Sequence, residues 1–110
     1  MPAEDELARR RYEKLVGRLE SMMRAALKPQ YKGYYGQLIL NGDDLAEMGE
    51  LKDVRRAARE AANRLGWKPT TRLVNGRLFV LDAREAPAEI EQLAQDASAK
   101  AMDRAWQEQQ

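Results

Sequence analysis

The sequence predicts an α+β fold, in which long helices accompany a small antiparallel sheet. Two stretches, 4–28 and 50–65, repeat their apolar residues at helical spacing. Apolar runs also flank Asn75-Gly76, a dipeptide that strongly indicates a β-hairpin because both of its residues readily take a positive φ. With 110 residues, the chain has the length of one small domain, which we expect to span residues 1–110.

Residues 4–28 are expected to form a helix with an apolar face and a basic face. On a helical wheel the basic side chains lie opposite the apolar ones. The helix is expected to end before Pro29, because the residue that precedes a proline avoids the helical conformation. The apolar arc consists of Tyr12, Leu15, Val16, Leu19, Met22, Met23, Ala26 and Leu27.

Residues 35–41 are expected to form a strand, and residues 43–65 admit two interpretations. The first is a helix-turn-helix, with a short helix over 43–48, a break near Gly49 and a basic helix over 50–65. The second is a single helix that begins near Glu50. A lone glycine is a modest signal, and the choice stays open. Asp43 or Asp44 is the expected cap of the first turn.

The hairpin is expected over residues 67–82 and a last helix over 86–107. Pro69 indicates that the first hairpin strand is an edge strand, since proline cannot donate to a neighbouring strand. The second strand is expected to be more buried and, together with 35–41, to complete a three-stranded sheet. The apolar face of the last helix consists of Ile90, Leu93, Ala94, Ala97 and Ala101, with Met102 and Trp106 to one side.

The composition excludes several classes of protein. The chain has no cysteine and no histidine, so it has neither a disulfide framework nor a Cys/His zinc site. Serine or cysteine nucleophiles activated by histidine are excluded as well. No glycine-rich phosphate loop is present. We therefore expect a protein that is not an enzyme, with no catalytic residue, no metal and no cofactor.

The surroundings of the protein are also predicted from its composition. The acidic start and the lack of a long apolar run predict a cytoplasmic protein without a membrane partner. Arginine outnumbers lysine, and alanine is abundant, which is typical of a high-GC bacterial or phage genome.

The net charge of +1 conceals a strong asymmetry along the chain. Residues 9–77 hold 16 Lys and Arg against 8 Asp and Glu, whereas residues 83–110 are acidic. Clustered Lys and Arg are typical of surfaces that bind phosphates. The structural alternative is a solvated face of ordinary ion pairs, with the tyrosines of the 28–36 loop anchoring that loop to the core.

In the order of its elements, the chain resembles a winged helix-turn-helix module. The matching segments are 4–28, 35–41, 43–48, 50–65 and 67–82. This resemblance implies a recognition helix in the major groove, with Lys52, Arg55, Arg56 and Arg59 facing the groove. It also implies a wing that carries Arg72 and Arg77. The alternative fold is a helix followed by a β-α-β-β unit.

The sequence thus predicts a small DNA-binding regulatory protein, and the alternative is a protein–protein interaction module, an adaptor or inhibitor. The first and last helices are expected to pack on each other within one chain or between chains. A homodimer would use Leu19, Met22, Met23 and the 86–107 helix. The residues expected to contact nucleic acid are Lys52, Arg55, Arg56, Arg59, Asn63, Lys68, Arg72, Arg77, Lys32 and Tyr34.

Overall fold

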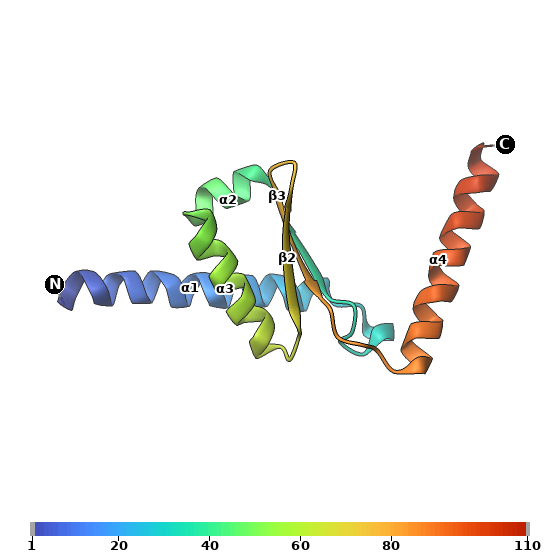
Figure 1. Cartoon of the computed structure of the whole chain (residues 1–110), viewed down its shortest axis with the longest axis horizontal. Coiled ribbons are helices and arrows are strands. Elements are labelled where there is room, and N and C mark those ends of the chain that lie inside the picture. Colours follow the sequence, from blue (N-terminus) through green and yellow to red (C-terminus); the bar gives the residue numbers. More distant parts are fainter. Residues whose placement is uncertain (1, 110) are drawn as a thin grey trace.

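The computed structural model describes residues 2–109 and has the predicted α+β fold. In chain order it contains α1, a short 3-10 helix η1, β1, α2, α3, the hairpin β2–β3 and α4. The molecule is elongated, with extents of 62 × 31 × 19 Å. The N-terminal end of α1 and the helix α4 lie at opposite ends, and α3 and the sheet lie between them (Figure 1).

Helix α1 (Pro2–Ala26) supplies one side of the core, as predicted. Val16, Leu19 and Met23 of its apolar face are fully buried, and the larger neighbours on that face pack against them. The helix ends two residues before the predicted position, and η1 (Pro29–Tyr31) follows it. Ala26, in the last position of α1, is exposed rather than part of the apolar contact.

The sheet is antiparallel, with β3 (Arg77–Asp82) between β1 (Gln37–Leu40) and β2 (Pro69–Val74). β3 is therefore the central strand and β2 an edge strand, as predicted. Successive side chains of a strand point to opposite faces. Leu78 and Val80 accordingly face the core with their partners on β1, whereas Phe79 faces outward.

The segment that was open to two interpretations forms two helices, α2 (Gly42–Met48) and α3 (Leu51–Arg64). Gly49 lies between them with a φ of 123°, a conformation that L side chains rarely adopt. The cap of α2 is Asn41 rather than Asp43 or Asp44. Its side chain accepts a hydrogen bond from the backbone N–H of Asp44 (2.8 Å), and the Asp44 carboxylate accepts one from Asn41 (3.2 Å).

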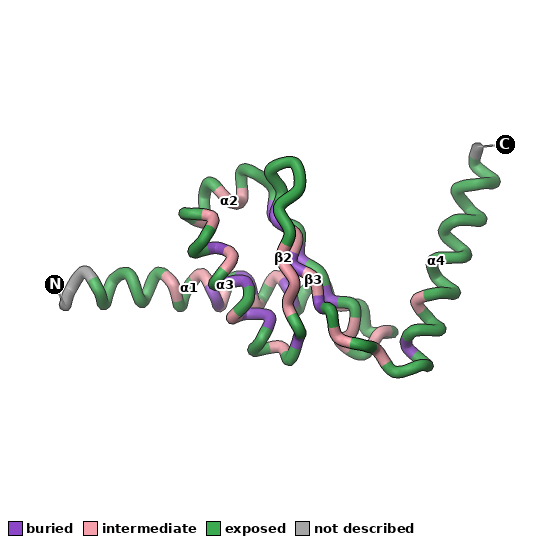
Figure 2. The backbone as a smooth tube through the Cα atoms, in the orientation of Figure 1, coloured by how far each residue is buried: buried purple, intermediate pink, exposed green. Residues whose placement is uncertain are grey.

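Helix α3 packs between α1 and the sheet through small side chains. Four of its buried residues are alanines, so the helix backbone can approach its neighbours closely. With the aliphatic residues of α1, β1 and β3, they form a single core (Figure 2). The buried side chains of α3 are Val54, Ala57, Ala58, Ala61 and Ala62.

Helix α4 (Ala88–Gln109) stands away from this core (Figures 1 and 2). Its principal contact is with η1, so the packing of the first helix on the last within one chain is not formed. Among the described side chains of α4, only Ile90 is buried. Within residues 2–109, no helix has both the length and the apolar composition needed to cross a membrane.

Candidate nucleic-acid interface

The face of α3 that points away from the core is basic and exposed. At 100° per residue, Lys52, Arg56, Arg59 and Asn63 fall within an arc of about 60° opposite the buried alanines. All four residues are exposed. The structure therefore brings together four of the predicted site residues on one helical face.

Two of these arginines also hold α3 to its neighbours. Arg56 stacks on the ring of Tyr12 in α1, with 4.7 Å between the guanidinium carbon and the ring centroid. Arg59 donates a hydrogen bond to the Thr71 hydroxyl of β2 at 3.5 Å. Burial, followed by the hydrogen bond and the negative charge of Glu60, raises the pKa of Tyr12 despite the opposing effect of Arg56. These contacts orient the basic face of α3 relative to α1 and the hairpin.

Arg55 occupies a different position from the other cations of α3. It is half-buried, and its Nε is buried without a hydrogen-bond partner in the described part of the chain. On the helical wheel it lies between the core and Arg59. Its position means that the loss of Arg55 changes packing as well as surface charge.

The hairpin carries its basic residues on the outer face of the sheet. Arg72 pairs with Phe79, and Arg77 pairs with Val74 beside the turn. Because Phe79 points away from the core, Arg72 and Arg77 also point away from α3. Asn75 and Gly76 form the turn with φ values of 52° and 76°. The two arginines thus form a second basic surface, on the outer face of the hairpin and separate from the face of α3.

Three predicted site residues lie elsewhere. Lys68 precedes β2 and is at the opposite end of the hairpin from Arg77. Lys32 ends η1 in a left-handed conformation, and η1 lies beside α4 (Figure 1). The ring of Tyr34 packs under Arg84, at 4.6 Å from its guanidinium carbon. Tyr34 therefore anchors its loop, and neither it nor Lys32 adjoins the exposed face of α3.

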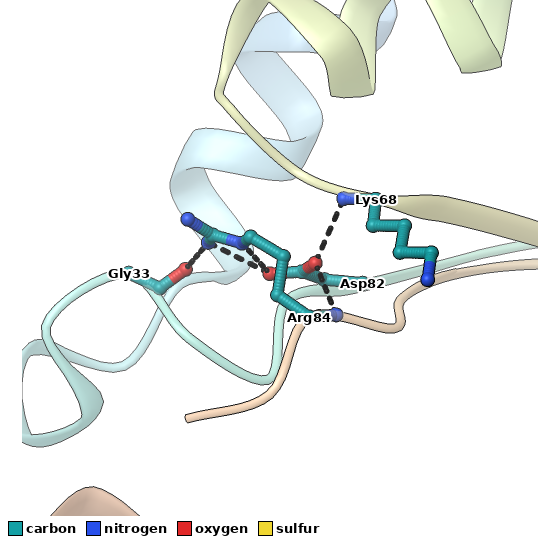
Figure 3. Close-up of polar contacts among 4 residues, drawn as sticks. All are labelled: Gly33, Lys68, Asp82 and Arg84. Carbon is teal, nitrogen blue, oxygen red and sulfur yellow. Dashed lines mark hydrogen bonds and ion pairs between the residues drawn. The ribbon is translucent and has the colours of Figure 1, made fainter. Parts of the chain in front are cut away.

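Sequence reasoning missed the most strongly bonded polar group of the molecule, the Asp82 carboxylate (Figure 3). Asp82 is the last residue of β3. Its side chain is fully buried and accepts hydrogen bonds from the backbone N–H groups of Lys68 (3.0 Å) and Arg84 (3.1 Å). The Arg84 guanidinium lies 2.7 Å away and also donates to the Gly33 carbonyl at 2.8 Å. The alternation of inward side chains at 78, 80 and 82 was the signal that could have predicted this burial.

The cluster around Asp82 has a structural role. Burial alone would raise the pKa of Asp82, but the hydrogen bonds from the Arg84 side chain and from the two backbone N–H groups outweigh it, so the pKa is lowered. The carboxylate stays ionised, and its oxygens are occupied by donors from this chain. Among the described residues, no group of three acidic side chains gathers to hold a metal ion.

One groove opens between the N-terminal half of α1 and the turn from α2 to α3. Its volume is about 590 Å³, with Tyr12, Leu15 and Met48 among its apolar lining residues. Its charged lining residues are Arg9, Arg11, Asp53 and Arg56.

The predicted dimer residues are divided between the core and the surface. Leu19 and Met23 are fully buried within their own chain, and Met22 packs against that core. These three side chains pack within their own chain. They are therefore not a free surface for a homodimer, which corrects that part of the predicted dimer interface. The 86–107 segment, by contrast, is mostly exposed.

Comparisons with protein-family models, with curated proteins and with solved structures found no match to this chain.

Proposed function

We propose that this protein binds double-stranded DNA through α3 and the β2–β3 hairpin and acts as a small regulatory protein. The observation that carries this proposal is the exposed basic face of α3, which adjoins the hairpin through the bond from Arg59 to Thr71. An α-helix of this kind fits the width of the major groove of B-DNA. In this proposal α3 enters the groove and the β2–β3 hairpin lies beside it.

Each part of the surface has a distinct task in this proposal. Lys52 and Arg59 neutralise phosphates or reach base edges, and Asn63 supplies the amide that pairs well with adenine. Arg72 and Arg77 on the hairpin contact the backbone beside the groove, which positions the helix. Arg56 is fixed on Tyr12, so its charge attracts DNA from a set position.

The test is fluorescence anisotropy of a labelled random-sequence DNA duplex at about 50 and 200 mM salt. Each phosphate contact adds about 0.9 to the slope of log affinity against log salt. The double variant Lys52→Ala/Arg59→Ala should therefore lower that slope by about 2. The matched control is Arg10→Ala/Arg24→Ala, which removes the same charge from α1 but only breaks exposed pairs with Glu6 and Glu20.

The outcomes separate this proposal from its alternatives. A duplex RNA of the same length should bind more weakly, because its major groove is too deep and narrow to admit α3. If both double variants lose the same DNA affinity, overall charge, and not the basic face of α3, attracts DNA. If the wild-type chain binds no DNA at about 50 mM salt, the proposal is wrong, and a role as an adaptor or inhibitor of another protein is favoured.

A further inference from the structure

We propose that α4 of one copy packs on the N-terminal half of α1 in a second copy, and that two such contacts form a reciprocal dimer. This inference goes beyond DNA binding and does not depend on it. It starts from α4, a long helix that leaves large apolar side chains exposed. α4 has 22 residues, yet beyond its first turn it exposes Leu93 (46%), Met102 (72%) and Trp106 (64%).

An exposed helix of this length needs a partner. In proteins, most of the stability of a helix comes from packing of its apolar face rather than from intrinsic propensity. Met102 and Trp106 are separated by four residues, so they lie one above the other on the same side of the helix. They form an apolar patch on the outer half of α4, where no other described element covers them.

The groove beside α1 offers a surface of matching chemistry. Its apolar lining includes Tyr12, Leu15 and Met48, and three arginines against one aspartate line its charged parts. Leu7, next to the lining residue Ala8, is half-exposed and extends the apolar surface along α1. An indole ring seated here would also be attracted to the guanidinium groups.

Charge favours a second copy on this groove over a pair of α4 helices. α4 carries five acidic residues and two basic ones, so two α4 helices would repel each other. The groove carries the opposite sign. Within one chain the two surfaces cannot meet, because α4 and the N-terminal half of α1 lie at opposite ends of the molecule (Figure 1). They can meet only between chains.

The area required also favours a reciprocal arrangement. A tryptophan buries about 150–250 Å², whereas a stable interface buries about 1,200 Å² or more. One contact of Met102 and Trp106 falls short of that area. Two contacts related by a two-fold axis double it and cover Leu7 in both chains.

The absence of cysteine from the chain allows a direct test by disulfide trapping. Ala8→Cys places a thiol in the groove and Met102→Cys places one on α4. Equimolar chains, equilibrated in glutathione buffer without DNA, should form a mixed disulfide, whereas neither variant alone should form one. Ala46→Cys, exposed on α2, is the matched control and should not react with Met102→Cys.

Sedimentation of the cysteine-free chain completes the test. Wild type should be a dimer at tens of micromolar, and Met102→Ala/Trp106→Ala should raise the dimer Kd at least tenfold without changing the circular dichroism of the fold. Arg9→Glu/Arg11→Glu should weaken the dimer, whereas Arg10→Glu/Lys14→Glu on the same helix should weaken it much less. A monomer at all concentrations, or trapping of Met102→Cys with itself alone, would overturn the proposal. Because DNA is absent, its failure leaves the proposed function unaffected.

Discussion

Replacing Asp82 with asparagine should destabilise the fold by about 2–3 kcal/mol at neutral pH. The substitution keeps the size of the side chain and one acceptor oxygen. It puts an NH₂ group where a carboxylate oxygen now accepts from Arg84, so two donors face each other. The Arg84 guanidinium then lacks its counter-ion, although its bond to the Gly33 carbonyl remains.

The magnitude follows from the burial of the two partners. Breaking a fully buried ion pair by removing one partner costs about 3–5 kcal/mol. The Asp82 side chain is fully buried, but Arg84 keeps 28% of its side chain exposed, so water replaces part of the lost interaction. A loss of about 2–3 kcal/mol would lower the Tm of a domain of this size by about 10 °C.

The pH dependence of the stability difference provides a second, independent test of the prediction. The pKa of Asp82 is lower in the folded chain than in the unfolded one. Its ionised form therefore stabilises the fold fully above the unfolded pKa of about 4, and this contribution is lost as the pH falls through the folded pKa. The difference between wild type and Asp82→Asn should accordingly be largest near neutrality and shrink in acid.

The assay is urea unfolding followed by circular dichroism, at several pH values between about 3 and 7. Glu85→Gln is the control, because it neutralises an exposed carboxylate three residues away. A variant within about 0.5 kcal/mol of wild type at neutral pH would refute the reasoning. A difference that does not change with pH would show that the ionised carboxylate is not the stabilising group.

Two further predictions concern the core and its closest backbone approach. Leu19→Ala should cost about 2–5 kcal/mol in urea unfolding, because the side chain is fully buried, whereas Leu73→Ala, 45% exposed on β2, should cost much less. Gly36→Ala should unfold the domain or shift the emission of Trp67, since a Cβ at Gly36 would overlap the indole ring. Gly17→Ala should instead raise stability by about 0.5–1 kcal/mol, because no atom lies within 4 Å of its added Cβ in the middle of α1. Equal Tm changes for the two glycine variants would contradict this account.

The elements that sequence reasoning predicted correctly are those fixed by local pattern. The hairpin follows from the conformational needs of Asn75-Gly76, and α1 follows from the spacing of its apolar residues, of which Leu19 and Met23 are now seen to be buried. The face of α3 was predicted in the same way, since burial of its alanines leaves Lys52 and Arg59 exposed. The spacing of apolar residues is sufficient to predict which face of a helix or strand is buried when that face packs on a single core.

The features that sequence reasoning missed depend on contacts between distant residues. Asp82 is paired with Arg84, whose guanidinium also donates to the Gly33 carbonyl, and no pattern near Asp82 shows that Gly33 lies beside this pair. Arg55 and Arg59 were both predicted to lie on the basic face of α3, but Arg55 is half-buried and Arg59 is exposed. The expected contact between the first and last helices depends on the direction in which α4 leaves the sheet, and no local pattern fixes that direction.

The base of α4 is held by its contact with η1 and by the segment that begins at Arg84. Residues 85–87 lead from Arg84 into the helix, and the backbone and side chain of Arg84 are bonded to Asp82 and to the Gly33 carbonyl. A helix of 22 residues is about 33 Å long. A rotation of the helix by about 10° at this anchor therefore moves its far end by about 6 Å. Trp106 lies about 27 Å along the helix from Ala88, so the same rotation moves it by about 5 Å.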